Sequence, residues 1–163
     1  MVTAAGLRER ALEAAAHVFD PEIPVLTIGD LGVLRDVRVV GDTVEIDITP
    51  TYSGCPAMRV IELDLDTALR AAGIDKFRIS TVLSPAWTTD WLSPEGRRKL
   101  ATFGIAPPAG QASRRGLFTS DSVRCPRCGS AETERLAEFG STACKALYRC
   151  RSCAEPFDYF KCH

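Results

Sequence analysis

The chain has 163 residues, a net charge of −1 and 45% hydrophobic residues, as expected of a globular protein with one ordinary domain and one small one. No window approaches the roughly 18 apolar residues of a membrane helix, and the first residues lack the apolar core of a signal peptide. We therefore expect a cytoplasmic protein without membrane contact.

The charge is unevenly distributed along the chain. Residues 1–96 carry 8 Lys/Arg against 15 Asp/Glu, whereas residues 97–163 carry 12 against 6. A basic half could meet nucleic acid or an acidic partner. It lacks a basic stripe with interleaved aromatic residues, so the sequence argues against nucleic acid and favours two oppositely charged, solvated surfaces.

Hydrophobic periodicity predicts the elements of the first hundred residues. In chain order they are a helix ending at Asp20-Pro21, strands over 33–40 and 43–49, a helix over 56–72, a strand over 77–83 and a helix over 94–104. Thr3 and Ser93 are expected to cap the first and last helices, and Gly41-Asp42 to form a two-residue hairpin turn. This order predicts a small α/β domain over residues 1–104.

The remaining residues differ in composition. Residues 105–122 are rich in Gly, Pro, Ala and Ser, which is typical of a linker. Residues 123–163 are too few for a large core and need another means of stabilisation. Three strand-like pieces, "ETERLAEF", "KALYRC" and "PFDYFK", indicate a three-stranded ribbon.

Two Cys-x-x-Cys pairs lie in this tail, Cys125 with Cys128 and Cys150 with Cys153. Two such pairs supply four thiolates for one tetrahedral ion, most typically structural zinc. Disulfides and an iron–sulfur cluster are the alternatives. Cys144 and Cys162 could pair with each other, replace a ligand, carry a transient cluster or simply be reduced, core-facing thiols.

Cys55 stands apart from the other cysteines, in "TPTYSGCPAM". If the flanking strands are parallel, it lies at the carboxyl edge of the sheet, where open α/β folds place ligands. It also lies at a helix start, where unpaired N–H groups should lower the pKa of the thiol. The alternative is a small residue buried by packing.

Residues around Cys55 could complete a pocket or a docking surface. Thr51 and Ser53 offer hydroxyls, and the loop after the third strand brings Trp87, Asp90 and Trp91 to the same edge. Because the two histidines, His17 and His163, are poorly placed to activate Cys55, protease chemistry is disfavoured. The loop carboxylates Asp20, Glu22 and Asp30 are expected to cap turns, or else to form a metal or partner site.

Three longer stretches resemble known families. "DPEIPVLTIGDLGVLRDVRV", "ITPTYSGCPAM" and "LSPAWTTDWLSPEGRRKL" are similar to the SufT-like domain of iron–sulfur assembly factors. With "GIAPP", "CPRCGS", "GSTACKALYRC" and "EPFDYFKCH", the whole chain resembles the D-subunit family of phenylacetyl-CoA epoxidase, the ring-activating monooxygenase system of phenylacetate degradation.

The resemblance implies a SufT-like α/β domain with a mixed sheet and flanking helices, followed by a zinc-ribbon-like domain. It implies a maturation factor that assists iron or iron–sulfur cluster assembly of the epoxidase reductase, rather than an enzyme by itself. Cys55 matches the family's functional thiol, and the two Cys-x-x-Cys pairs match its metal ligands. The implied partners are the reductase or oxygenase subunits, an iron–sulfur scaffold protein, or a second copy of the chain. The alternative is a structural or electron-transfer component of the epoxidase complex.

Overall fold

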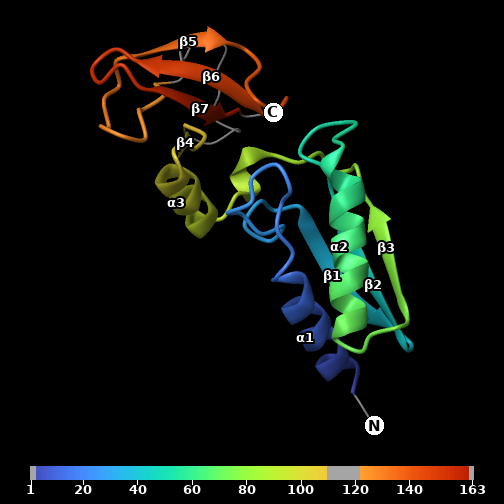
Figure 1. Ribbon diagram of the computed structural model, residues 1–163. Coiled ribbons are helices and arrows are strands. Elements are labelled where there is room, and N and C mark those ends of the chain that lie inside the picture. Colours follow the sequence, from blue (N-terminus) through green and yellow to red (C-terminus); the bar gives the residue numbers. More distant parts are fainter. Residues whose placement is uncertain (1–2, 110–121, 162–163) are drawn as a thin grey trace. The chain divides into compact units, whose positions relative to one another are not determined.

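The computed structural model describes residues 3–109 and 122–161. Contacts divide the chain into two units, the sheet unit (Met1–Trp87) and the ribbon unit (Thr88–His163). Among the described residues, no helix is long and apolar enough to cross a membrane. The described residues form three α-helices, one short 3-10 helix and two sheets, which are labelled in Figure 1, and each unit is described by itself below.

The sheet unit contains a three-stranded mixed sheet and two helices. Its elements are α1 (Ala4–Ala15), β1 (Leu34–Val40), β2 (Thr43–Ile48), α2 (Ala57–Ala71) and β3 (Phe77–Thr81). The strands lie in the order β1-β2-β3, with β1 antiparallel and β3 parallel to β2. The predicted parallel crossover through α2 and the mixed sheet are confirmed.

Local signals place most of these boundaries. The Thr3 hydroxyl accepts the N–H of Gly6 at 3.2 Å, as predicted for a helix cap. The prediction that α1 reaches Asp20 was wrong, because the helix ends at Ala15. The backbone beyond it turns away to pair with the following loop, where Ile28 N–H donates to the carbonyl of Val18 at 3.0 Å.

The two faces of the sheet differ in character. On β2, Val44, Ile46 and Ile48 are fully buried and share one face, as a period of two requires. Both helices lie over one face of the sheet (Figure 1), and α2 contributes a buried stripe at helical spacing. That stripe consists of Ala57, Met58, Ile61, Leu65 and Leu69.

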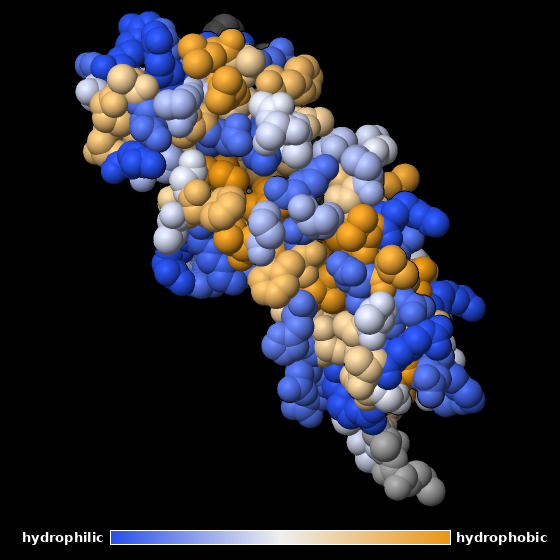
Figure 2. All heavy atoms as spheres, in the orientation of Figure 1, coloured by the Kyte–Doolittle hydropathy of each residue, from blue (hydrophilic) through white to orange (hydrophobic). Residues whose placement is uncertain are grey.

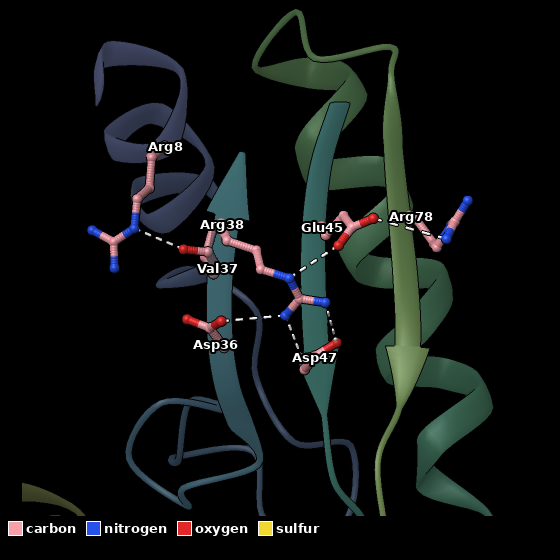
Figure 3. A network of polar contacts seen from close by, with 7 residues as sticks. All are labelled: Arg8, Asp36, Val37, Arg38, Glu45, Asp47 and Arg78. Carbon is pink, nitrogen blue, oxygen red and sulfur yellow. Dashed lines mark hydrogen bonds and ion pairs between the residues drawn. The ribbon is translucent and has the colours of Figure 1, made fainter. Parts of the chain in front are cut away.

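A charged network occupies the opposite, open face (Figure 3). Arg38 of β1 bonds to Glu45 at 2.9 Å, to Asp36 at 3.2 Å and to Asp47. Arg78 of β3 approaches Glu45 at 3.8 Å. The hydrogen bonds that Arg38 donates raise the pKa of its guanidinium further above the ordinary value, and the bond to Asp47 has the largest effect. The network joins all three strands across the face that the helices do not cover.

The ribbon unit begins with helical turns and ends in a small sheet. Its elements are η1 (Thr89–Trp91), α3 (Pro94–Phe103), β4 (Ile105–Ala106), β5 (Thr133–Ala137), β6 (Lys145–Cys150) and β7 (Pro156–Phe160). The predicted cap of α3 is confirmed, since the Ser93 hydroxyl accepts Gly96 N–H at 2.9 Å and Gly104 ends the helix in the left-handed conformation.

The predicted ribbon strands are present, with one addition. The sheet order is β4-β7-β6-β5, and β4 pairs in parallel with β7. β4 lies where the linker was expected to begin, and Ile105 and Ala106 are both buried. The small core on one face of the ribbon consists of Ala106, Val123, Cys125, Ala146, Cys150, Phe157 and Tyr159. A core of this size is marginal by itself and calls for a further source of stability.

The division between the two contact units falls after Trp87. Contacts place α3 with the ribbon unit, and Arg97 of α3 donates to the carbonyls of Thr89 at 2.9 Å and Pro108 at 3.0 Å. The proposed division into residues 1–104, 105–122 and 123–163 concerns independent folding and stays a prediction. Most of that linker, residues 110–121, lies outside the described residues.

Candidate thiol site and metal centre

Cys55 lies at the start of α2, in the loop that follows β2. Gly54 before it has a φ of +77°, a left-handed conformation that favours glycine and turns the chain into the helix. The Cys55 N–H donates to the carbonyl of Tyr52 at 3.3 Å, and its carbonyl accepts the N–H of Met58 at 3.4 Å. Because β2 and β3 are parallel, the half-buried thiol lies at the carboxyl edge of the sheet.

The prediction of a lowered thiol pKa was wrong. Burial raises the pKa of Cys55, and the negative charges of Glu22 and Asp20 raise it further. Hydrogen bonds with the Ala57 backbone and the Tyr52 side chain lower the pKa, but by less than burial and the carboxylates raise it. Cys55 therefore holds its proton at neutral pH, unless a cation that the neighbouring carboxylates also attract replaces that proton.

The loop carboxylates hold the backbone that surrounds the thiol. The Asp20 carboxylate accepts the N–H groups of Glu22 at 2.8 Å and Ile23 at 2.7 Å, and Asp20 is only 7% exposed. The Thr27 N–H donates to the Asp30 carboxylate at 3.1 Å, and the Asp30 N–H donates to the Thr27 hydroxyl at 3.0 Å. Asp20 and Asp30 thus have the capping role, while Glu22 is the half-buried carboxylate that acts on Cys55 mainly through its charge.

The remaining predicted pocket residues are distributed over both units. Trp87 is 5% exposed, and its indole N–H donates to the carbonyl of Leu31 at 2.8 Å, so it belongs to the core of the sheet unit. Thr51 is half-buried and Ser53 exposed in the loop before Cys55, whereas Asp90 and Trp91 belong to the ribbon unit. A pocket built from these residues stays a prediction.

Sequence reasoning missed Tyr52 as a neighbour of the thiol. It also did not anticipate that Asp20 and Glu22 would approach Cys55 from a loop 33 residues earlier in the chain. The available signal was the Pro-rich loop itself, which had to be ordered by tertiary contacts with some part of the sheet edge.

Four cysteines form a compact cluster in the ribbon unit. The Sγ atoms of Cys125, Cys128, Cys150 and Cys153 all lie within 4.8 Å of one another. Cys125 and Cys153 are 3.8 Å apart, and Cys128 and Cys150 are 3.5 Å apart. A tetrahedral ion with metal–sulfur bonds of 2.3 Å requires sulfur separations of about 3.8 Å. The donor set and its spacing are those of a metal-binding site.

The two halves of this cluster have the same backbone geometry. In each, the first cysteine donates its N–H to a carbonyl five residues later, Cys125 to Ser130 and Cys150 to Glu155, both at 2.9 Å. The residue four positions on has a positive φ in both, +76° at Gly129 and +62° at Ala154. Two matched knuckles therefore present their thiols to one point.

The electrostatics of the cluster also suit a cation. Hydrogen bonds from the N–H groups of Cys153 and Ser152 lower the pKa of Cys150 to about 6. The pKa of Cys153 is raised to about 12 despite a hydrogen bond from the Glu155 backbone, because burial and the neighbouring thiols oppose a further negative charge. A bound cation removes that opposition and permits the remaining thiols to ionise.

Of the two spare cysteines, Cys144 is described, and it lies outside this cluster. Cys144 is 3% exposed, and its Sγ lies 3.0 Å from the hydroxyl of Thr142. It is not grouped with the four thiols. Cys162 lies outside the described residues, so a ligand role for either cysteine stays a prediction.

Family models match both parts of the chain. Residues 8–80 match the model described as an iron–sulfur cluster assembly protein, and residues 109–161 match the model described as a zinc β-ribbon domain of the PaaD type. Both units therefore carry the sequence patterns that their geometry suggested. Together they define a class of protein in which an assembly-type α/β domain is joined to a metal-binding ribbon.

The chain is 53% identical, over 90% of its length and 88% of the relative's, to an Escherichia coli (strain K12) protein that is provisionally named as the D-subunit of 1,2-phenylacetyl-CoA epoxidase. This chain belongs to the D-subunit family of 1,2-phenylacetyl-CoA epoxidase.

Solved structures are similar to part of the chain. A domain of unknown function (DUF59) from Bacillus anthracis is 23% identical, covers 60% of this chain and 93% of its own, and superposes with a TM-score of 0.55. A conserved hypothetical protein from Thermotoga maritima is 28% identical, covers 57% of this chain and 92% of its own, and has a TM-score of 0.49. The first similarity shows that the α/β part has the DUF59 fold.

Proposed function

We infer that this chain is a maturation factor for a phenylacetyl-CoA epoxidase of the multicomponent monooxygenase type. Its client is the reductase component, and its cargo is iron or an iron–sulfur cluster. The family relative is named as a subunit of such an epoxidase, and residues 8–80 match the iron–sulfur assembly model. The chain acts as an accessory protein to this system and works in the cytoplasm.

The observation that carries this proposal is the setting of Cys55. A half-buried thiol at the carboxyl edge of the sheet lies where the charges of Glu22 and Asp20 raise its pKa. The same carboxylates that retain the proton attract a metal cation. When iron or a cluster iron binds the sulfur, the proton leaves to solvent and a thiolate ligand remains. Such a site binds its cargo and releases it again when a proton or a client ligand competes.

The ribbon cluster has a different role in this proposal. Four thiols in two matched knuckles form a closed tetrahedral site, and the ion that suits such a site best is structural zinc. Zinc there stabilises a unit whose core is small and does not take part in transfer. The ribbon then supplies a docking surface for the reductase, the oxygenase subunits or a scaffold protein.

The metal content of the protein tests these assignments. We would purify wild type, Cys55→Ser and Asp64→Asn without oxygen and measure zinc, iron and acid-labile sulfide per chain. Asp64 is an exposed residue of α2, so its variant controls for a general effect on the helix. We expect one zinc in all three proteins, with iron or sulfide only in wild type and Asp64→Asn.

A second measurement tests the function itself. The reductase component is produced with each variant, and its cluster content is measured after purification. Cys55→Ser should lower that content, whereas Asp64→Asn should not. A fully matured reductase in the presence of Cys55→Ser would rule out the maturation role.

The name of the relative supports a second candidate, a structural or electron-transfer component of the epoxidase complex. This candidate requires stable, stoichiometric co-purification with the oxygenase subunits. If the oxygenase subunits, with their cofactors loaded, are fully active without this chain, the second candidate is excluded.

A further inference from the structure

The ribbon sheet has a second face, opposite its small core. Strand partners share a face, so Ile105 of β4, Asp158 of β7 and Leu147 of β6 form one row across three neighbouring strands (Figure 1). Lys145 of β6 lies on the same face, diagonal to Asp158. The residues between them along the strands supply the core on the other face. This second face therefore combines apolar side chains with a charged pair.

A pocket of about 380 Å³ lies on this face, beside the end of α3. Its apolar lining includes Phe103, Ile105, Leu147 and Phe157, and Lys145 and Asp158 provide its charged groups. All of these residues belong to the ribbon unit. Figure 2 shows apolar side chains, in orange, beside charged ones on the surface of this unit. Apolar walls with a few polar groups are typical of a small-molecule site.

The ammonium of Lys145 is buried without a hydrogen bond among the described residues. The Lys145 side chain is only 7% exposed, and the nearest charged group is the Asp158 carboxylate at 3.8 Å. That separation is too long for a hydrogen bond. The carboxylate instead accepts the hydroxyl of Ser141 at 3.4 Å. Because a buried ammonium requires acceptors for its N–H groups, a ligand that supplies one is favoured here.

The loop between β5 and β6 fixes the separation of the two charges. The Gly140 N–H donates to the carbonyl of Lys145 at 2.7 Å. A Cβ atom on Gly140 would lie 2.8 Å from an oxygen of the Asp158 carboxylate, closer than any real side chain allows. The loop thus packs its backbone directly against the pair, and the 3.8 Å gap is a built feature of the pocket.

The charged pair determines which ligands fit. An anion is attracted by Lys145 and repelled by Asp158, and the reverse holds for a cation. The next charged residue on this face, Arg149, is paired with Glu134. An uncharged carboxamide offers both an acceptor and a donor, and its oxygen and nitrogen lie about 2.2 Å apart. It can therefore accept from Lys145 and donate to Asp158 across the 3.8 Å gap.

We propose that this pocket of the ribbon unit binds a small, uncharged ligand that carries a carboxamide on an apolar ring or branched chain. The carboxamide bridges Lys145 and Asp158, and the apolar part lies against Phe103, Ile105 and Leu147. The ribbon is then a ligand-binding unit as well as a metal-binding one. This inference is independent of the Cys55 thiol and goes beyond the proposed function.

Three probes that share one benzene ring test the proposal on the full, zinc-loaded chain. They are benzamide, which is neutral, benzoate, which is an anion, and benzylamine, which is a cation. Amide NMR shifts measure the binding of each. Benzamide should shift the signals of Ile105, Lys145, Leu147 and Asp158 with a dissociation constant of about 1 mM. Benzoate and benzylamine should bind at least about fivefold more weakly.

Variants of the pair should change this preference in opposite directions. Asp158→Asn leaves Lys145 unopposed and should make benzoate the tightest of the three probes. Lys145→Met should weaken benzamide by about fivefold or more and favour benzylamine. Lys161→Met is the matched control, because this lysine contacts the Glu138 carbonyl and the Phe139 ring instead.

The zinc content and circular dichroism of each variant verify that the ribbon is folded. The test on wild type does not depend on any variant. Equal affinity for the three probes, or shifts that spare the pocket, would overturn the proposal. So would an absence of benzamide binding at about 20 mM, or the same preference in Asp158→Asn as in wild type.

Discussion

Cys55 and Glu22 show how a tertiary neighbour outweighs a local effect. The start of α2 alone would favour the thiolate, but burial and two carboxylates from a distant loop hold the proton on the sulfur. The chemistry of this thiol therefore depends on how close a cation comes, rather than on pH near neutrality.

The reactivity of Cys55 tests this balance. Alkylation of the Cys55 peptide, followed by mass spectrometry, should rise with pH around a midpoint above that of an ordinary thiol. Glu22→Gln removes one negative charge, lowers the pKa of Cys55 and should make alkylation faster at a given alkaline pH. Burial is the larger cause and remains in the variant, so its midpoint should still exceed that of free cysteine. Equal profiles in both proteins would show that Glu22 does not act on the sulfur.

Among the described residues, Ala154 is the one residue other than glycine that has a positive φ. Its counterpart in the other knuckle is a glycine, Gly129, which adopts that conformation without steric cost. Ala154→Gly should therefore raise the free energy of unfolding of the zinc-loaded protein by about 0.5–1 kcal/mol. Urea titration measures this difference, and Gly129→Ala should shift the stability in the opposite direction.

At the scale of elements, Arg38 links the strands of the open face. Its removal leaves Asp36, Glu45 and Asp47 close together without their shared cation. We expect Arg38→Leu to lower the free energy of unfolding only modestly, since ion pairs open to solvent contribute little. The loss should shrink in about 1 M salt, where charges are screened. Arg78→Leu, which removes one 3.8 Å contact, should cost less and provides the control.

The elements also show what the sequence could predict. Helix caps such as Thr3 and Ser93, and the Cys-x-x-Cys knuckles, are local patterns, so short windows contain the whole signal. The two-residue strand β4 is too short for any periodicity to appear, and its burial depends on β7, some 50 residues later. The carboxylates beside Cys55 likewise come from a separate loop, which a pattern around the cysteine could not reveal.

For the whole molecule, the two units should respond differently to loss of metal. The sheet unit has a buried core of its own, whereas the ribbon core is small and contains two of the four thiols. A strong chelator should therefore unfold the ribbon and leave the sheet unit folded. Amide NMR spectra should lose dispersion for residues 122–161 and keep it for residues 3–87. Readdition of zinc should restore the lost signals, and a collapse of both units together would contradict this prediction.

The short strand β4 has a consequence for how the chain tolerates being cut. The described chain stops at Ala109, just after β4, and resumes at Ser122, beside Val123, which is buried in the ribbon core. Both ends of this segment are thus anchored in the same unit, with β4 held by β7 and the carbonyl of Val123 accepting the hydroxyl of Thr133 at 2.7 Å. If the chain is cut between these two ends, non-covalent contacts of β4 and Val123 should hold the two fragments together, and the nicked protein should elute like the intact one until denaturant is added.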